Sequence, residues 1–351
     1  MIISVKKAFS LTIIFCGLII IQSFGQKKDG IFSRKKIVNQ YSTVGIGGGS
    51  SHYFGDLAPY TYAYYGLYTN VRWNGTINYT RYLSEKLAAR ASFTYARIYG
   101  DDYTFSNRNI EKLASQAIRN LHFRNDLKEF TVSGIYNLLP QYNKGPKGRN
   151  TFMPFVSAGL GFYGHNPKAI LRTSATQTYS TKDERKDWVA LYGYNTSGQN
   201  LPGSTIKKYS LVQIVAPVSV GFRIKVGKSW DFSAEAGFRY TPTDYLDDVG
   251  NTVYPDFALL EANFGLNAPL MSYRANEDFH AASGANRISQ FLNAATIKGM
   301  VTSSGTSPSL NSENIYPTSS LRGSKRLDSY VLTQFTISYV LSNNIKCPVI
   351  R

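Results

Sequence analysis

The chain has 351 residues, enough for one large domain or two smaller ones. Aromatic residues and glycine are abundant while charged residues make up only 17%, which favours β-structure over a helical bundle. Two cysteines exclude a disulfide framework and a cysteine-based zinc cluster, and the formal net charge of +17 makes the protein basic.

The N-terminus is predicted to be a cleaved signal peptide. Residues 1–7 form a basic start and residues 8–21 an apolar run. Ser23 and Gly25 supply the small residues that a cleavage site needs. The run is too short to span a bilayer comfortably, so export is favoured over an N-terminal membrane anchor.

Eight later segments alternate apolar and polar residues with the period of a β-strand. In the seventh, Phe232 and Phe238 share one face, while Glu235 and Arg239 share the other. We expect strands over Tyr41–Ser50, Leu67–Tyr82, Leu87–Tyr99, Glu129–Leu139, Phe152–Gly164, Tyr209–Val226, Trp230–Thr241 and Ser329–Leu341.

A membrane barrel explains these segments better than a soluble sandwich does. They are longer than ordinary strands, and they carry full charges such as Arg90 in mid-strand, which a sandwich core could hardly bury. Their connections also alternate in length. The short ones cover residues 84–86, 140–150 and 227–229, and the long ones cover roughly 51–66, 100–128, 165–208 and 242–328.

This alternation indicates a direction, because outer-membrane barrels combine short periplasmic turns with longer extracellular loops. The sequence therefore predicts an all-β fold, an eight-stranded antiparallel transmembrane β-barrel with long extracellular loops containing short helices. The segments are a signal peptide (1–25), a periplasmic N-terminal segment (26–40), the outer-membrane barrel (41–341, with its longest loop over 242–328) and a periplasmic C-terminal tail (342–351).

Three loop segments show helical periodicity. They are Asn109–Leu121, with Asn109 as the N-cap, and the stretches FALLEANF (257–264) and NRISQFLNAATIKG (286–299). Residues 302–314 are rich in Ser, Gly and Asn, and they are predicted to form a flexible loop tip.

Charged residues on the polar strand faces are expected to point into the barrel. An eight-stranded barrel is just wide enough for side chains to fill it. The predicted lumen network comprises Arg90, Arg223, Asp231, Glu235 and Arg239, and it predicts a closed interior with no open pore.

Two groups of carboxylates follow outward-running strands and are expected at the extracellular rim. They are Asp101, Asp102, Asp244, Asp247 and Asp248. One hypothesis is a rim cation site, since Ca²⁺ prefers hard oxygen ligands. The favoured alternative is that they start loops and pair with Arg97, Arg108 or Arg239. On that reading, changing Asp244 and Asp247 to Asn loosens the longest loop.

Positive charge gathers at both ends of the predicted barrel. A periplasmic basic face is expected from Lys35, Lys36, Lys144, Lys147 and Arg149, where an acidic partner or anionic lipid would bind. Arg322, Lys325 and Arg326 fall near the outer end of the last strand, beside the phosphates of lipopolysaccharide. A nucleic-acid partner is not needed to explain the charge.

Catalytic motifs are absent from the sequence: it contains no G-x-S-x-G, H-E-x-x-H or C-x-x-C. Residues 159–164 fit G-x-G-x-x-G but lie inside a predicted strand, where a nucleotide fingerprint does not belong. His52, His122, His165 and His280 fall in or beside long loops, which leaves a rim hydrolase as the least favoured alternative. No cofactor is expected.

Five stretches within residues 41–250 carry a family resemblance, in the order GIGGGSSHYFGDLAP, LAARASFTYARIYGDD, RNLHFRNDLKEFTVSGIYNLLP, FMPFVSAGLGFYGHNPKA and FRYTPTDYLDDVG. They resemble the Bacteroidetes outer-membrane barrel family DUF6089, which includes relatives of the outer-membrane barrel subunit of the type IX secretion system. The resemblance implies an outer-membrane location and, as one option, a role in protein secretion or envelope assembly with periplasmic partners. It supplies no catalytic residue.

The sequence thus predicts a non-enzymatic structural or interaction barrel. The alternative is a surface ligand-binding or adhesin-like barrel that acts through its extracellular loops.

Overall fold

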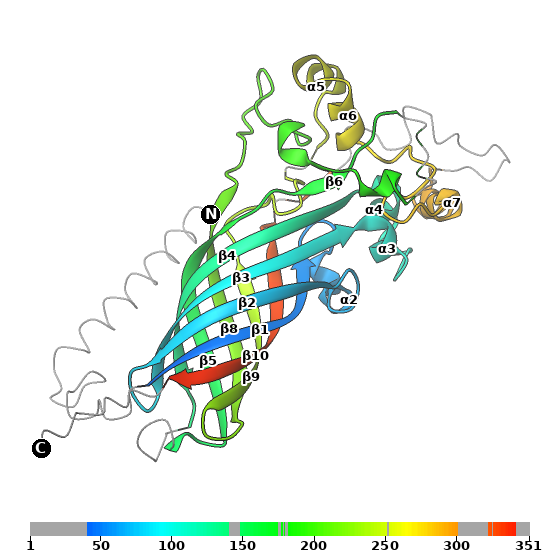
Figure 1. Ribbon diagram of the computed structural model, residues 1–351. Helices are drawn as coiled ribbons and strands as arrows, with labels where there is room; N and C mark the ends of the chain where they lie inside the picture. The colour runs from blue at the N-terminus through cyan, green and yellow to red at the C-terminus, as the bar shows by residue number, and fades with distance from the viewer. Residues whose placement is uncertain are drawn as a thin grey trace, which may run out of the picture.

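The computed structural model describes residues 41–139, 148–174, 177, 179, 182–250, 253–300, 322–324 and 326–341. Eight long strands in this part form one antiparallel sheet that closes on itself (Figure 1). The order around the barrel is β1–β2–β3–β4–β5–β8–β9–β10, and β10 pairs with β1 to complete the ring. The predicted eight-stranded antiparallel barrel is confirmed.

The barrel strands are β1 (Tyr41–Phe54), β2 (Arg72–Tyr82), β3 (Leu87–Asp101), β4 (His122–Asn137), β5 (Phe152–Gly164), β8 (Val212–Lys225), β9 (Trp230–Tyr240) and β10 (Ser329–Leu341). Two further short strands, β6 (Lys168–Ile170) and β7 (Trp188–Ala190), extend the sheet beyond the barrel from β4. The sequence did not predict them.

Close backbone approach explains the glycine-rich middle of β1. A Cβ atom added at Gly49 would lie 1.9 Å from the carbonyl oxygen of Thr333 on β10. Gly159 and Gly161 in β5 are similar, since their Cβ atoms would meet the carbonyl oxygens of Val132 and Phe130 at 2.3 and 2.1 Å. The G-x-G-x-x-G stretch therefore serves strand packing.

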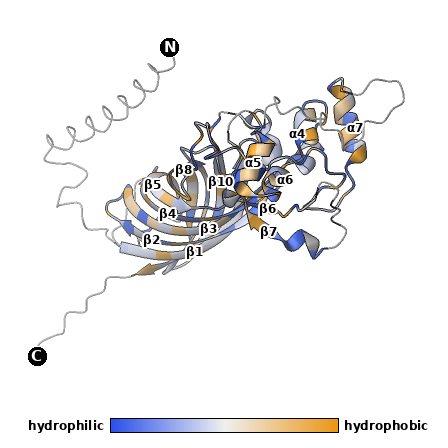
Figure 2. Ribbon diagram, turned by 90° about the horizontal axis from the view of Figure 1, so that it is seen from above, coloured by the Kyte–Doolittle hydropathy of each residue, from blue (hydrophilic) through white to orange (hydrophobic). Residues whose placement is uncertain are grey.

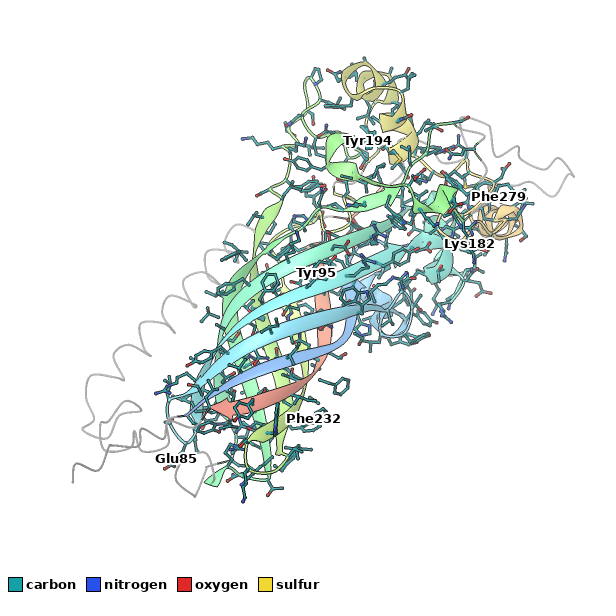
Figure 3. All side chains as sticks on the ribbon, in the orientation of Figure 1. Glu85, Tyr95, Lys182, Tyr194, Phe232 and Phe279 are labelled. Carbon is teal, nitrogen blue, oxygen red and sulfur yellow. The ribbon has the colours of Figure 1, made fainter. Side chains whose placement is uncertain are left out.

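The connections alternate as predicted. The described parts of the turns 83–86, 138–151 and 226–229 lie at one end of the barrel, and the described parts of the loops 55–71, 102–121, 165–211 and 241–328 lie at the other (Figure 1). Glu85 marks the short-turn end, whereas Tyr194 and Phe279 lie among the loops (Figure 3). We call the described residues of these four long loops the loop domain.

Short helices occur throughout the loop domain. They are η2 (Tyr60–Tyr62), α2 (Ala63–Gly66), α3 (Asp102–Ser106), α4 (Ala114–Arg119), η4 (Glu184–Lys186), η5 (Leu191–Gly193), α5 (Phe257–Phe264), α6 (Asn267–Ser272) and α7 (Ile288–Ile297). The helices expected at 257–264 and 286–299 are present as α5 and α7. The one expected over 109–121 is reduced to α4, although the Asn109 side chain does accept a hydrogen bond from the amide of Lys112 at 3.2 Å.

Four predicted strand boundaries differ from the structure by three residues or more. β2 begins at Arg72 and not at Leu67, because η2 and α2 occupy the preceding loop. β4 begins at His122 and not at Glu129, β1 continues to Phe54, and β8 begins at Val212. Each difference lies at the loop end, where the pattern of polar and apolar residues changes.

Strand β4 shows that change clearly. Between Phe130 and Tyr136 its outward face is apolar, with Val132 54% exposed, while its inward face carries Thr131 and Ser133. Towards the loop end the two faces exchange character. Phe123 and Leu127 are buried inside, and the outward face carries Arg124, Asp126 and Lys128.

The exchange produces two interiors in one barrel. At the loop end the interior is an apolar cluster that includes Tyr53, Ile98, Phe123, Leu127, Tyr163, Val215, Leu246 and Leu332. In the short-turn half it is mostly polar and charged, with a smaller apolar cluster of Tyr41, Tyr82, Ala88, Ile135, Phe155 and Val340. The exterior there is apolar, with Ile46 68%, Leu160 66% and Val220 60% exposed, and apolar residues recur along the barrel strands in Figure 2.

No helix among the described residues is both long and apolar enough to cross a membrane.

Candidate functional site

Ion pairs fill the short-turn half of the barrel. The two terminal nitrogens of Arg90 bind the two carboxylate oxygens of Glu235 at 2.6 and 2.8 Å. Arg223 lies over the Tyr82 ring, 4.7 Å from its centroid, and 4.0 Å from Asp231. All five residues of the predicted lumen network point into this interior, and Arg239 lies 3.7 Å from a carboxylate that the sequence analysis left out, Glu129.

Two of the network's buried members were not assigned to it from the sequence. Glu129 accepts a hydrogen bond from the Tyr330 hydroxyl at 2.6 Å. Arg149 was assigned to a periplasmic basic face, and this is wrong. It is 4% exposed, and its Nε lies 3.0 Å from the Asp231 carboxylate inside the barrel.

The correction for Arg149 has a simple physical reason. The turn that carries it follows β4, and Asp231 at the start of β9 would otherwise be a carboxylate buried without a close counter-ion. The other four residues of the proposed basic face, Lys35, Lys36, Lys144 and Lys147, lie outside the described residues.

The five rim aspartates lie at the loop end, but they divide among separate contacts. Asp101 caps α3, accepting from the amide of Tyr103 at 2.9 Å, and lies 3.0 Å from Nε2 of His280. Asp102 binds Arg119 through both carboxylate oxygens, at 2.7 and 2.8 Å. Asp248, at a φ of +66°, accepts from the hydroxyls of Thr196 and Tyr209.

The arginine partners expected for these aspartates are wrong. Arg97 pairs with Asp126 at 2.5 Å, Arg239 lies near Glu129, and Arg108 donates to the Thr69 hydroxyl at 3.0 Å. In the described part of the chain, no three His, Cys, Asp or Glu residues are placed to hold a metal ion. The loop-anchor reading of the aspartates therefore describes them better than the cation hypothesis does.

Asp247 and Asp328 share one hydroxyl. Tyr53 lies 2.7 Å from Asp247 Oδ2 and 2.9 Å from Asp328 Oδ1, and a phenol has a single proton to donate. The second contact therefore needs a proton on a carboxyl group. Burial and the neighbouring carboxylates raise the pKa of both Asp247 and Asp328 well above the usual range, and burial raises the pKa of nearby Asp244 to about 9.

His280 lies between a serine and an aspartate, which are the other residue types of a hydrolase triad. Its Nδ1 lies 2.7 Å from the Ser283 hydroxyl and 3.3 Å from the Ser283 amide, and its Nε2 faces Asp101. The ring is buried and stacked on Tyr103, and Asp101 is already occupied by the α3 cap. We interpret the arrangement as a loop anchor. His52, His122 and His165 are buried in other contacts.

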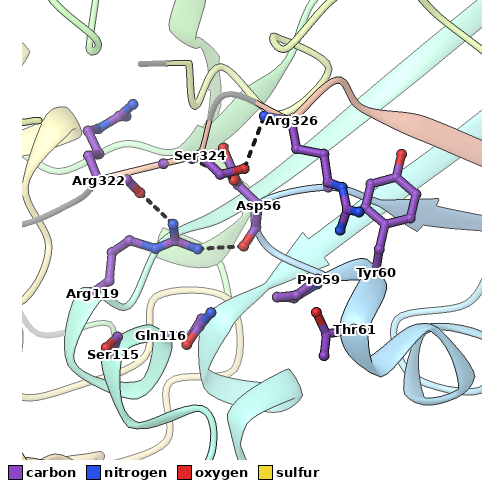
Figure 4. A pocket seen from close by; sticks show the side chains of 12 residues that line it. Asp56, Pro59, Tyr60, Thr61, Ser115, Gln116, Arg119, Arg322, Ser324 and Arg326 are labelled. Carbon is purple, nitrogen blue, oxygen red and sulfur yellow. Dashed lines mark hydrogen bonds between the residues drawn. The ribbon is translucent and has the colours of Figure 1, made fainter. Parts of the chain in front are cut away.

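A cavity of about 380 Å³ opens between three of the long loops (Figure 4). Its walls come from the first loop at 55–61, from α4, and from residues 322–324 and Arg326 before β10. Arg119 fixes these loops to one another: it donates to the carbonyl oxygens of Asp56 at 2.9 Å and Arg322 at 2.5 Å while its guanidinium is paired with Asp102. Neither Arg119 nor Asp56 was predicted from the sequence as a site residue.

A second contact holds the same loops. Asp56 Oδ1 accepts from the amide of Ser324 at 2.9 Å, and the Tyr60 hydroxyl donates to the carbonyl oxygen of Leu327 at 2.9 Å. Arg326 lies across the Tyr60 ring, 4.9 Å from its centroid. The cavity is therefore built by contacts between segments that are far apart in the sequence, and local patterns could not have indicated it.

A closed barrel with an apolar outer belt and a charged interior has the fold of eight-stranded outer-membrane β-barrels. The family model described as Domain of unknown function (DUF6089) matches residues 30–189, which agrees with the resemblance seen in the sequence. No curated protein matches the chain.

Several solved structures of bacterial barrels are similar. Ail of Yersinia pestis has a TM-score of 0.33 at 8% identity, covering 86% of this chain and 99% of its own. The N-terminal barrel domain of Pseudomonas aeruginosa OprF has a TM-score of 0.30 at 8% identity, with coverage of 85% and 97%. Neisserial surface protein A has a TM-score of 0.31 at 12% identity, with coverage of 57% and 84%. Likeness at this level tells nothing of what this chain binds.

Proposed function

We propose that the protein is a non-enzymatic integral outer-membrane barrel, exported by a cleaved signal peptide, that holds the loop domain at the cell surface as an interaction module. The observation that carries this proposal is the exchange of polarity along the strands. An apolar exterior around a polar interior suits a bilayer, and a charged exterior around an apolar interior suits water. β4 has both, divided near Glu129.

The loop domain supports a role in recognition. Its segments are joined by buried arginines, including Arg119, Arg274 and Arg287, which donate to backbone carbonyl oxygens of other long loops. A surface that only covered the barrel mouth would not need such cross-linking. Ordered loops on a rigid barrel are where binding sites are commonly found.

A role at the periplasmic end is the second candidate. It is supported by the resemblance to a family with relatives in type IX secretion, and Lys35, Lys36, Lys144 and Lys147 would be its basic contact residues. Periplasmic secretion or envelope proteins, and the lipid and lipopolysaccharide of the outer membrane, are the proposed partners.

The filled interior predicts that the barrel does not conduct ions. Arg90 is paired with Glu235 and Arg149 with Asp231 inside the barrel, Arg223 lies 4.0 Å from Asp231, and the apolar cluster closes the loop end. Purified protein reconstituted into a planar bilayer is expected to give no stepwise current at 1 M salt. A porin inserted in the same bilayer serves as the positive control, and regular single-channel steps from this barrel would contradict the proposed sealed anchor.

A further inference from the structure

We infer that the cavity between the first, second and fourth long loops binds an acidic sugar, meaning a sugar ring that bears a carboxylate or phosphate group. The inference rests on the proposed function, because it names the ligand class that the loop domain would recognise. It is carried by the size of the cavity, by the polar side chains on its walls, and by one exposed cation that pairs with no described carboxylate.

The cavity volume fits a small ligand. About 380 Å³ lies within the range of roughly 300–1,000 Å³ that is common for small-molecule sites, and it is large enough for one or two sugar rings. The walls are fixed before any ligand arrives, since Arg119 and Asp56 tie the three loops together. A preformed site of this kind avoids the entropy cost of ordering loops on binding.

The polar side chains on the walls are available to a ligand. Thr61, Ser115 and Gln116 line the cavity, and none of the three side chains hydrogen-bonds to another described residue. Two hydroxyls and an amide can each both donate and accept. Ring hydroxyls of a sugar have the same dual character, whereas a purely apolar ligand would leave these groups unpaired.

The charge comes from Arg326. It is exposed, it lies over the Tyr60 ring, and among the described residues no carboxylate lies within salt-bridge distance of it. Arg119 is paired with Asp102, and the guanidinium of Arg322 is buried, where it donates to the backbone carbonyl oxygen of Asp248 and to the hydroxyls of Ser197 and Thr196. A guanidinium presents a planar pair of donors, which matches a carboxylate or phosphate.

The test is titration calorimetry on the purified barrel folded in detergent, with glucuronate, glucose 6-phosphate, glucose and inorganic phosphate as probes. We expect glucuronate and glucose 6-phosphate to bind, and glucose and phosphate to bind at least about tenfold more weakly, because each supplies only half of the contacts. Arg326→Gln is expected to lower the affinity for glucuronate roughly tenfold or more, to the level of glucose. Gln116→Ala should lower the affinities for glucuronate and for glucose by the same factor.

Arg108→Gln is the matched control. Arg108 also lies over a tyrosine, 5.0 Å from the Tyr68 centroid, but it is not part of the cavity wall. The inference is overturned if no acidic sugar binds to folded wild-type protein at 10 mM. Equal binding of glucose and glucuronate, or an equal loss in Arg108→Gln, would overturn it too.

The acidic sugar could come from the phosphorylated sugars of lipopolysaccharide or from a soluble acidic oligosaccharide. Competition against bound glucuronate by lipopolysaccharide micelles and by hyaluronan oligosaccharides separates the two sources, and displacement by either supports the inference. Failure of both to displace it would count against it. These titrations use purified protein, so their outcome is independent of whether the loop domain faces the cell exterior.

Discussion

Arg119→Ala is expected to release the loop domain while leaving the barrel folded. The substitution leaves Asp102, which is fully buried, without its counter-ion, and it removes the donors that hold the carbonyl oxygens of Asp56 and Arg322. Breaking one partner of such a buried pair costs about 3–5 kcal/mol. We expect the loops to become sensitive to limited proteolysis, while the barrel keeps its heat-dependent shift on a detergent gel.

Arg108→Ala provides the comparison, because that side chain is exposed at the edge of the same loops. It should digest like the wild type. Loops that stay resistant in Arg119→Ala would show that Arg119 does not hold them together. Loss of the gel shift would show instead that barrel and loops fold as a single unit.

The second large effect concerns Asp247. Its pKa and that of Asp328 are raised in the folded protein, so the folded state retains a proton that the unfolded chain releases above about pH 4. Stability of the loop end should therefore fall as pH rises from about 4 through the raised folded-state pKa values. Asp247→Asn cannot ionise, it can still accept from the Val249 amide, and it can donate to the Tyr53 oxygen.

Asp247→Asn is therefore expected to stabilise the loop domain by about 1–3 kcal/mol at pH 8, and by much less at pH 5. Amide hydrogen exchange around residues 244–250, compared at the two pH values, measures this. Asp183→Asn is the control, since Asp183 lies in an exposed surface pair with Lys186. Faster exchange in Asp247→Asn at pH 8 would contradict the shared-proton account.

This prediction has the opposite sign to the one drawn from the sequence, where Asn at 244 and 247 was expected to loosen the loop. The difference comes from partners that the sequence does not place. Tyr53 belongs to β1 and Asp328 precedes β10, so the cluster forms only when the barrel closes. The sequence shows only that Asp244, Asp247 and Asp248 are close to one another along the chain.

The sequence was most informative where one physical rule covers a whole segment. Strand alternation predicted the barrel because the lipid-facing half of each strand is apolar on one face, as in Phe232 and Phe238 of β9. The same rule was misleading between the loop and Glu129 on β4, where Phe123 and Leu127 point inwards and charged residues point outwards. A search for strands whose apolar residues switch from one face to the other would have found the loop-end half of β4.

The candidate site could be predicted only in part. The charges inside the barrel follow from the polar faces of single strands. Arg149 was misplaced because it lies in a turn, where side chains do not alternate between two faces of a strand. The cavity depends on Arg119 reaching Arg322 across more than half of the chain, a contact that no local spacing encodes. Buried arginines in loops were the signal available, and they look like surface charges in a sequence.

The most direct test of the account is labelling of intact cells with a membrane-impermeant maleimide, in a Cys347→Ser background. Leu266→Cys places a thiol between α5 and α6, at a residue that is 72% exposed, and Lys228→Cys places one in the turn between β8 and β9. We expect position 266 to be labelled on intact cells and position 228 only after lysis. Labelling of 228 on intact cells, or protection of 266, would contradict a barrel that spans the outer membrane with its long loops outside.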